Sequence, residues 1–591
     1  MNPLVSDRNV EFVLYEQLDA LQLCSLPYFE GHGRETFDLL LASIRKLARE
    51  VLFPAFKPMD EEPPKMVAGQ LRVHPAMREL WPRLTELGIA TATRPAEVGG
   101  QQLPHLVAGM AQHYGMAANG AAVAYLGLTQ GAAHLIEAFG DDFLRRELMP
   151  RMYSGEWTGT MALTEPHAGS SLADVATRAR PLAGGEYSLS GNKVFISGGD
   201  QDLTPNIVHL VLARIEGAPA GIRGVSLFAV PKKRLDGADN DCTCAGAFHK
   251  LGWRGLPSIA LNFGERGDCR GWLVGQAGKG IAQMFQMMNE ARIMVGLNAV
   301  STASAAYFES LEYARTRPQG RALSSRDPGT PQLNIIEHAD VRRMLLKQKC
   351  IVEGGLSLLA ACARYADLSQ HAREPEERHR AQLLLDLLTP VAKTFPAERG
   401  FDSCVLSVQI HGGYGYTSEY LPEAWLRDQK LNTIHEGTSG IQSLDLLGRK
   451  AVAEGGAALL ALREEIEATL QRAAAAGVER AWIEAVRGAA ELIGELTLEL
   501  AQKGLSGDRD GMMLHSYDYL DLFATAAVAW QWLDQAAAAK EARKPADRDF
   551  YAGKLLAAQH FILAELPRIS MLAHLCRTAE DSYSRITPDQ Y

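Results

Sequence analysis

The hydrophobic period of this chain changes twice along its 591 residues. Apolar residues first recur at helical spacing, from Phe37 to about Arg151, with many Ala and Gly residues that let helices approach closely. The period shortens near Trp157, and helical spacing returns at Ile281. The middle segments are β-branched or aromatic and are separated by turn residues: GTMALT, YSLSGNKVFISGG, IVHLVLARI, GVSLFAV and SIALNF. This order predicts an α+β fold with a small β-barrel between two helical domains.

Further helical segments flank this core. The run from Val10 to Leu23 predicts a short amphipathic packing helix. A break after the first core helix is predicted at a group of prolines: Pro54, Pro58, Pro63 and Pro64. After Arg449, four alanine-rich amphipathic helices are expected to dock as an antiparallel bundle, and their acidic balance favours domain packing over membrane attachment. The predicted domains are an N-terminal extension (1–36), a helical domain (37–155), a β-barrel domain (156–275), a four-helix bundle (276–450) and an additional helical domain (451–591).

The net charge and the cysteine content limit which functions and locations the sequence supports. The net charge of −10 at pH 7 disfavours nucleic-acid binding by broad neutralisation of phosphates. Eight cysteines without a CxxC motif predict reduced thiols, and the close pair Cys242 and Cys244 is interpreted as incidental, so no metal site is expected. The N-terminus lacks the pattern of a secretory signal or transit peptide, and no stretch reaches the roughly 18 apolar residues of a membrane span. A cytoplasmic protein is expected.

The stretch 409–442 carries the strongest chemical signal. Gly412 and Gly413 permit positive φ and close backbone approach to a ligand, although most glycine-rich turns only reverse the chain. Further on, Glu436 is followed by the small residues GTS, which leave space beside the carboxylate and offer N–H and hydroxyl donors. A glutamate there serves as a general base if burial raises its pKa above about 4.3. The alternative is a helix-entry or surface glutamate, which periodicity alone favours.

A second chemical signal lies in the predicted barrel, within MALTEPHAGSSLADVATRA. Thr164 and the Gly169 and Ser170 pair bracket a turn, where hydroxyl and N–H groups at a strand end are suited to an electron-rich ring. A decorated β-turn is the equal alternative. In the next strand, Phe195 and Ser197 occupy alternate positions and are predicted to project from one face. Core packing is the ordinary meaning of such a phenylalanine.

Arg292 lies within an otherwise apolar helical run, MMNEARIMVG. Burying an arginine without a partner is costly, so the sequence predicts one. Glu290 is the local candidate, and an adenosine or phosphate group of a ligand is the functional alternative.

These segments resemble the motifs of the acyl-CoA dehydrogenase family: a Q-x-x-G-G-x-G-[FY] turn, an R-D-x-K…[YH]-E-G-T-S-x-I-Q segment and a T-E-P-x-A-G-S-D turn. The resemblance runs from about Phe37 to Lys450, and FVLYE resembles the start of a longer branch of the family. It implies the family's fold, FAD as cofactor, and oxidation of a saturated acyl-CoA to trans-2-enoyl-CoA, as in fatty-acid β-oxidation. It also implies an electron-transfer flavoprotein as acceptor and a homodimer or a dimer of dimers.

The resemblance also assigns roles to single positions. It places the catalytic base on Glu436, and it matches Arg317 to the arginine that binds the FAD pyrophosphate of the neighbouring subunit. The positions that match FAD-binding residues are Leu163, Thr164, Gly169, Ser170, Phe195, Ser197, Arg317, Gln409, Gly412, Gly413 and Thr438. Those that match acyl-CoA-binding residues are Ser170, Asn289, Arg292 and Gly437. Two departures from the family pattern, His435 and Gly440, leave the shape of the acyl pocket open. Further departures are Ser171 in the flavin-binding turn and Gly320 and Arg321 after Arg317.

Three rival functions remain at this point. An acyl-CoA oxidase would share the base and the flavin but admit oxygen. A dehydrogenase of a specialised acyl group, such as 3-methylmercaptopropionyl-CoA, would have a similar length and start. A flavoprotein that docks on DNA would need a basic C-terminal face, and the net acidic tail disfavours it.

Overall fold

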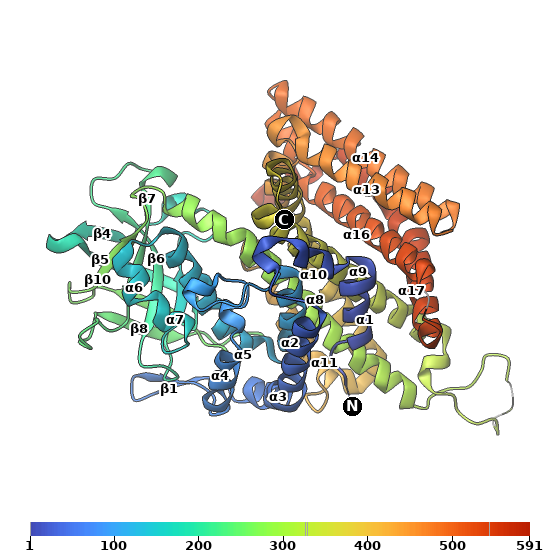
Figure 1. Cartoon of the computed structure of the whole chain (residues 1–591), viewed down its shortest axis with the longest axis horizontal. Helices are drawn as coiled ribbons and strands as arrows, with labels where there is room; N and C mark the ends of the chain where they lie inside the picture. The colour runs from blue at the N-terminus through green and yellow to red at the C-terminus, as the bar shows by residue number, and fades with distance from the viewer. Residues whose placement is uncertain (1, 326, 328, 543) are drawn as a thin grey trace. The chain divides into compact units, whose positions relative to one another are not determined.

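The computed structural model describes residues 2–325, 327, 329–542 and 544–591, and the side chains of residues 286–288 lie outside this description. Its contacts divide the chain into two compact units. Unit 1 consists of Met1–Phe37, Pro104–His113 and Arg292–Tyr591, and unit 2 of Asp38–Leu103 and Tyr114–Ala291. Figure 1 labels the main helices and strands of both units.

The helices of the predicted first domain precede the main sheet of unit 2. They are α2 (Arg34–Leu47), α3 (Phe53–Glu61), α4 (Met77–Glu86), α5 (His105–Phe139), α6 (Asp142–Glu147) and α7 (Met149–Tyr153). The break predicted at Pro54 and Pro58 is wrong, because both lie in α3. A π-turn at Ala48–Leu52 shifts the hydrogen-bond register, so the missing N–H of Pro54 falls at the start of α3, where it needs no partner.

The helix ends at Glu61, just before the other two predicted breakers, Pro63 and Pro64. A hairpin of β1 (Lys65–Val67) and β2 (Gln70–Arg72), which the helical pattern did not predict, follows.

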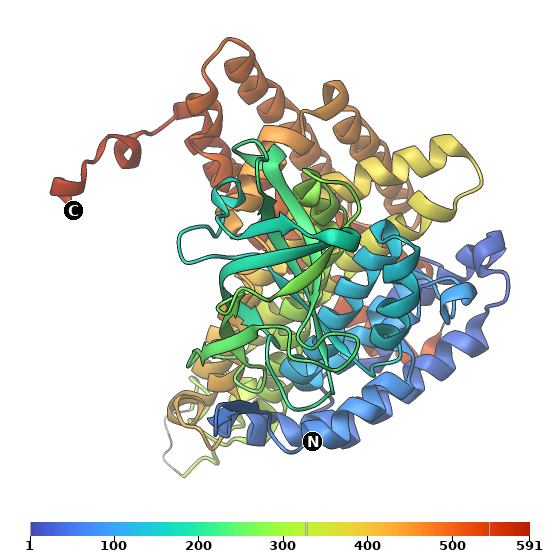
Figure 2. The same cartoon turned by 90° about the vertical axis from the view of Figure 1, so that its left-hand side faces the viewer.

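The middle of the chain forms an eight-stranded sheet. Its strands are β3 (Thr158–Ala162), β4 (Arg178–Pro181), β5 (Glu186–Ser197), β6 (Ile207–Ile215), β7 (Val225–Pro231), β8 (Cys242–Ala247), β9 (Ser258–Phe263) and β10 (Arg270–Val274). β10 pairs with both β7 and β5, which closes the ring β5–β4–β6–β7–β10. β9 and β8 continue from the second half of β5, and Figure 2 looks onto these strands. The predicted barrel is therefore confirmed.

Both faces of the central strands are buried. Val208, Leu210 and Leu212 of β6 pack with residues of α6 and α7, while Val211 and Ala213 point to the opposite face, into the barrel core. Because side chains alternate along a strand, burial on both faces requires an unbroken apolar run, which IVHLVLARI supplies.

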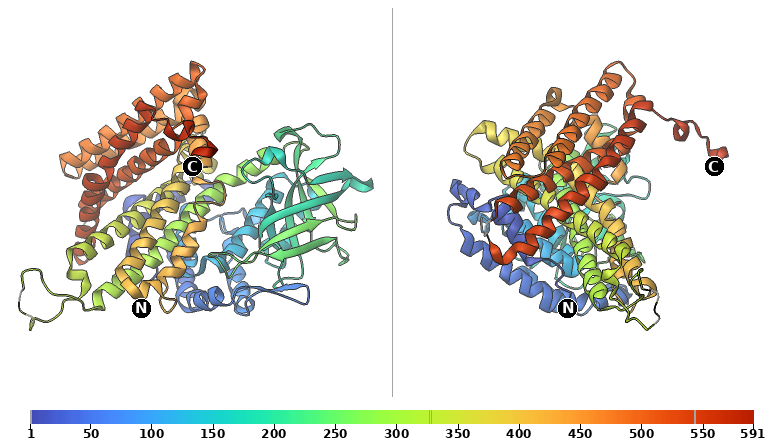
Figure 3. Two further views of the ribbon diagram at one scale, coloured as in Figure 1. Left: turned by 180° about the vertical axis from the view of Figure 1, so that it is seen from behind. Right: turned by 90° about the vertical axis from the view of Figure 1, so that its right-hand side faces the viewer.

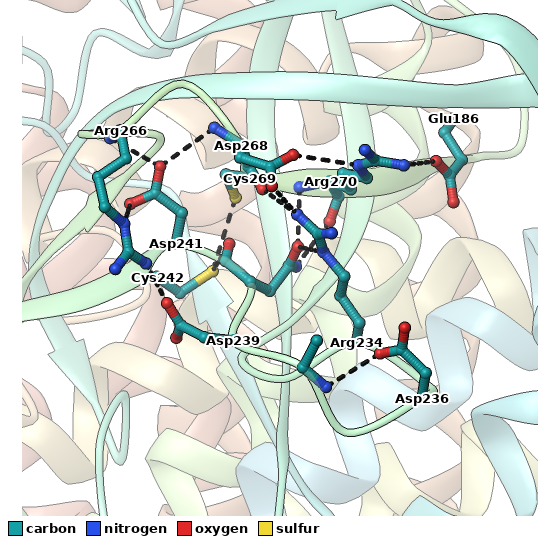
Figure 4. A network of polar contacts seen from close by, with 12 residues as sticks. Glu186, Arg234, Asp236, Asp239, Asp241, Cys242, Arg266, Asp268, Cys269 and Arg270 are labelled. Carbon is teal, nitrogen blue, oxygen red and sulfur yellow. Dashed lines mark hydrogen bonds and ion pairs between the residues drawn. The ribbon is translucent and has the colours of Figure 1, made fainter.

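One edge of the barrel carries a dense polar network, drawn in Figure 4. Asp241 accepts hydrogen bonds from the backbone N–H groups of Arg266 and Asp268. Beneath them, the sulfur of Cys242 lies 3.6 Å from that of Cys269 rather than facing its sequence neighbour Cys244. Within the described part of the chain, no group of three or more His, Cys, Asp or Glu residues is placed to hold a metal ion.

Unit 1 is helical. Its helices up to the Glu436 region are α1 (Asp7–Glu11), most of α8 (Gly280–Thr316), α9 (Ala339–His371), α10 (Pro375–His411), α11 (Pro422–Leu431) and α12 (Ser439–Asp445). The helix predicted from Val10 to Leu23 is only partly correct, because a π-turn follows α1 and the backbone turns at Asp19, where φ is 44°.

The C-terminal helices of unit 1 are α13 (Ala457–Ala475), α14 (Arg480–Leu505), α15 (Arg509–Met513), α16 (Ser516–Glu541), α17 (Arg548–His560), α18 (Ile569–Thr578) and α19 (Ser582–Arg585). Of these, α13 packs on α10, α17 on α9, and α16 on both, and Figure 3 shows the C-terminal helices beside this part of unit 1. The prediction of four amphipathic helices is wrong for α16, which is buried on nearly all sides by α9, α10, α13, α14, α17 and α18. The fourth predicted helix is divided into α17 and α18 by irregular turns that contain Pro567. None of the described helices is long and apolar enough to cross a membrane.

Candidate active site

Glu436 lies in a tight turn between α11 and α12. Its φ is 54°, and that of Gly437 is 88°, so two consecutive residues adopt the left-handed backbone region. This region costs little for glycine but is uncommon for glutamate, and such strain persists only where surrounding contacts impose it. The turn therefore fixes the backbone from which the Glu436 side chain projects.

Contacts from two helices impose this conformation. The Nε2 group of Gln442 in α12 donates to the carbonyls of Glu436 at 3.1 Å and of Gly437 at 3.3 Å. A Cβ atom on Gly437 would lie 2.8 Å from the same Nε2 group, so only glycine fits there. The Ser439 hydroxyl donates to Glu398 of α10 at 2.5 Å. Thr438 caps α12 by accepting a hydrogen bond from the N–H of Ile441.

Burial raises the pKa of Glu436, and the positive charges of Arg292 and Lys393 oppose this shift. Lys393 is fully buried, and no hydrogen-bond partner for its Nζ exists among the described residues. Burial lowers the pKa of Lys393 to about 8, although Glu398 and Glu436 favour its charged form. The carboxylate thus has the environment of a general base: a raised pKa, with cations nearby that keep the ionised form accessible.

Arg292 is 1% exposed and donates to Asp445 of α12 at 2.6 Å. This partner is neither Glu290 nor a ligand, the two options that the sequence left open. Asp445 also accepts from Arg449. The structure thus ties the arginine to the helix that follows the Glu436 turn. Binding of acyl-CoA by Arg292, and by the half-buried Asn289, stays a prediction.

The glycine-rich turn follows the end of α10. The N–H of Gly412 donates to the carbonyl of Gln409, and the φ of Gly412 is 62°. Gln409, Gly412 and Gly413 are all exposed. The guanidinium of the exposed Arg317 lies over the Tyr414 ring, 5.6 Å from its centroid. The structure thus brings the predicted arginine and the predicted glycine turn together in unit 1.

In unit 2, the strand end at Leu163 and Thr164 lies beside β5. The N–H of Val194 donates to the carbonyl of Thr164 at 2.9 Å, and Lys193 Nζ donates to the carbonyl of Leu163 at 3.0 Å. Two predicted groups, Leu163 with Thr164 and Phe195 with Ser197, are therefore neighbours. Gly169 and Ser170 are exposed on the turn that follows.

Phe195 departs from regular strand geometry. Its φ is 61°, and the pairing of β5 with β9 shifts register between Lys193 and Ile196. Ile196 is buried, whereas the Phe195 side chain is 63% exposed and contacts only one aromatic neighbour in the described chain, Phe248, at 4.7 Å between ring centroids. Core packing is therefore not its role. A bulge presents this ring outward, which simple alternation did not predict.

The sequence analysis missed the residues that support these groups. Glu165 and Lys193 form a buried ion pair of 2.8 Å directly beneath the Leu163 strand end. Burial alone would raise the pKa of Glu165, but Lys193 and hydrogen bonds from Thr177 and the N–H of Ala176 lower it. Lys393 and Gln442 were also missed. The only sign of such supporting residues in the sequence is a lysine within an apolar strand or helix segment. This sign does not show which residue the lysine contacts.

Family models match almost the whole chain. The models of the acyl-CoA dehydrogenase N-terminal, middle and C-terminal domains match residues 34–156, 160–265 and 278–452. A fourth model, described as acetyl-CoA dehydrogenase C-terminal like, matches residues 462–587.

Similar curated proteins are long bacterial enzymes. A butyryl-CoA dehydrogenase of Syntrophomonas wolfei is 37% identical over 77% of each chain. A 3-methylmercaptopropionyl-CoA dehydrogenase of Ruegeria pomeroyi is 36% identical and covers 88% of this chain and 89% of its own. A broad-specificity linear acyl-CoA dehydrogenase of Mycobacterium tuberculosis is 31% identical over 97% of each chain.

Solved structures share the fold. Caenorhabditis elegans ACDH-11 in complex with C11-CoA superposes with a TM-score of 0.81 at 20% identity, covering 99% of this chain and 96% of its own. A Bacillus anthracis acyl-CoA dehydrogenase complexed with FAD superposes with a TM-score of 0.74 at 21% identity, covering 98% of this chain and 92% of its own. From the domain models and the full-length relatives together, this chain belongs to the acyl-CoA dehydrogenase family.

Proposed function

We propose that Glu436 is the catalytic base with which this acyl-CoA dehydrogenase takes the α-proton of a saturated acyl-CoA, giving trans-2-enoyl-CoA. The observation that carries the proposal is the turn between two helices, which holds the backbone of Glu436, a residue whose carboxyl has a raised pKa. A thioester α-proton is only weakly acidic, so the thioester carbonyl must be polarised as the proton leaves, and the backbone N–H of Glu436 is the proposed donor.

The residues present fit FAD. In unit 2, the exposed Phe195 ring and the hydroxyls of Thr164 and Ser197 suit a flat, electron-rich ring system. In unit 1, the guanidinium of Arg317 suits a pyrophosphate as a charged hydrogen-bond donor. The backbone at Gly412 is open to such a group, because no atom lies within 4 Å of a Cβ placed on that glycine. When bound, FAD supplies the acceptor for the β-hydride.

Two kinds of acyl group are supported by the relatives. A straight-chain acyl-CoA is our first candidate, supported by the butyryl-CoA and linear acyl-CoA dehydrogenases among the relatives. A specialised acyl group is the second candidate, supported by the 3-methylmercaptopropionyl-CoA dehydrogenase at similar identity and higher coverage.

We also propose an electron-transfer flavoprotein as the acceptor, a homodimer or a dimer of dimers as the assembly, and a cytoplasmic location. The first two proposals follow from membership of the family. The third is supported by the eight cysteines, which are all free thiols.

Anaerobic titration of the purified yellow protein with saturated acyl-CoAs of increasing length tests the function. We expect the flavin absorbance to bleach with at least one straight-chain substrate, and trans-2-enoyl-CoA to form in equal amount. A parallel reaction in air, with peroxide measured, separates a dehydrogenase from an oxidase. No bleaching with any straight-chain or 3-methylmercaptopropionyl thioester would contradict the proposal.

A further inference from the structure

The Glu436 turn is supported by helices that in turn contact the additional C-terminal domain. α12, which begins three residues after Glu436, packs against α16 of that domain. The hydroxyls of Ser443 in α12 and Ser516 in α16 lie 3.1 Å apart, and both residues are buried. The helix that follows the catalytic turn is thus fixed to α16 by a polar contact as well as by packing.

A second connection runs through α10. Glu398 of α10 accepts the hydrogen bond from the Ser439 hydroxyl. The next residue, Arg399, donates to both carboxylate oxygens of Asp521 in α16, at 2.6 and 2.8 Å. Arg568, from the segment before α18, donates to the same carboxylate at 2.5 Å. Each arginine donates through one nitrogen, Nη2, so the Asp521 carboxylate is held by two separate charge-assisted contacts.

A cavity of about 220 Å³ lies where these groups meet. It is lined by residues of α10 and α16, among them Glu398, Arg399 and Asp521, and by Arg568 from the segment before α18. Packing between α10 and α16 is therefore incomplete beside Glu398, and the ion pairs of Asp521 join the two helices at this point.

From these contacts we propose that the C-terminal domain positions the catalytic base. Asp521 acts through Arg399 and α10, and Ser516 acts through Ser443 and α12; both are positioning residues for Glu436. The inference rests on the proposed function, because it concerns the geometry of the base assigned there. It gives residues 451–591 a part in the reaction besides the stability of the fold.

Two variants test the proposal in the full-length, FAD-loaded protein. Asp521→Asn weakens both arginine contacts, and Ser516→Ala removes the hydroxyl contact without changing charge. We expect kcat to fall about tenfold in Asp521→Asn, with KM and FAD content close to wild type, because a small displacement of a catalytic group lowers turnover more than binding. We expect a smaller fall of the same kind in Ser516→Ala.

The pH profile gives a readout that a merely structural role would not change. A loosened turn exposes the Glu436 carboxyl to water, so its raised pKa falls and the acid limb of kcat/KM moves to lower pH. Arg292 and Lys393 are the charges that act on this carboxyl, so losing the charge of Asp521 is not expected to cause that shift directly. Glu467→Gln, which breaks the 2.9 Å pair with Arg487 inside the same domain, is the control and should match wild type.

The outcomes separate the two proposals. Turnover retained in Glu436→Gln would reject the base itself. If Glu436→Gln is inactive while Asp521→Asn and Ser516→Ala keep the wild-type kcat and pH profile, only the positioning role is rejected. Should Asp521→Asn lose its flavin or melt early, Ser516→Ala decides alone: an unchanged kcat and acid limb in that variant reject the role.

Discussion

At the scale of single residues, Glu436 combines two unfavourable features, a left-handed backbone and a half-buried carboxylate whose pKa is raised by desolvation. Strain and desolvation of this kind persist at functional sites because neighbouring groups impose them. The motif around Glu436 was sufficient to single it out from the sequence. The residues that support Glu436 could not be identified in this way. Lys393 is distant in sequence and Gln442 is an ordinary helix residue, and the role of both is visible only when the fold brings them to the turn.

The charge of Lys393 leads to a prediction on pH dependence. Glu436 must be ionised to accept a proton, so kcat/KM rises as pH increases through its raised pKa. Lys393 lowers that pKa, and Lys393→Met should therefore move the acid limb of kcat/KM to higher pH. The free energy of unfolding of Lys393→Met should not fall below that of wild type, because the substitution removes an ammonium group that is buried without a hydrogen-bond partner among the described residues.

The pH profile of kcat/KM, measured on both proteins with one acyl-CoA, checks this shift. The exposed Lys46→Met serves as a control and should leave the profile unchanged. An acid limb that stays in place in Lys393→Met would show that the lysine does not act on the base.

At the scale of secondary-structure elements, long periodic segments were predictable and irregular ones were not. β3, β5, β6, β7 and β9 were found from their β-branched and aromatic runs. β4, β8 and β10 were missed, because the segments RARP, CTCAGA and RGWLV are short and contain arginine or glycine. α16 was misjudged because its alanine-rich sequence does not show that other helices cover every face.

The buried pair of Glu165 and Lys193 is the support that the barrel provides beneath the predicted flavin-binding strand end. Glu165→Gln leaves the Lys193 charge buried without its counterion, and we expect the free energy of unfolding to fall by about 3 kcal/mol. Because the pKa of Glu165 is lowered in the folded state, its stabilising effect is present above its ordinary pKa and is lost as pH falls.

Chemical denaturation near neutral pH measures the difference between Glu165→Gln and wild type. Glu265→Gln, on the exposed edge of the same barrel, is the matched control and should change stability far less than Glu165→Gln does. Equal effects of the two substitutions would mean that the buried pair has no special part in stability.

At the scale of the whole molecule, the two ends of the chain are joined by buried polar contacts within unit 1. Gln17 of the N-terminal extension donates to Ser357 of α9 at 2.7 Å and to Asp534 of α16 at 3.0 Å. Lys554 of α17 is fully buried and pairs with Glu353 of α9 at 2.8 Å. The sequence predicted that both end segments dock on the core, but it gave no indication that they share one network.

Docking of α16 on α9 depends on a single small residue. A Cβ atom on Gly354 would lie 2.5 Å from the Nε1 atom of Trp532, whose N–H donates to the carbonyl of Cys350. Gly354→Ala should therefore lower the free energy of unfolding by about 1–3 kcal/mol, despite the better helix propensity of alanine.

The adjacent Gly355→Ala is a matched control, because its Cβ would meet its nearest neighbour at 3.4 Å. It should be neutral or slightly stabilising. Thermal unfolding of both variants checks the pair, and a stable Gly354→Ala protein would mean that α16 and α9 do not pack as closely as described.

The most direct test of Glu436 as the base is exchange of the substrate's α-proton with solvent. The FAD-loaded protein is incubated in D2O with an acyl-CoA analogue that binds but is not oxidised, and α-deuterium is followed by mass spectrometry. Wild type is predicted to exchange the α-proton, and Glu436→Gln to bind the analogue while exchange falls by about a thousandfold. Exchange at the wild-type rate in Glu436→Gln would contradict the account.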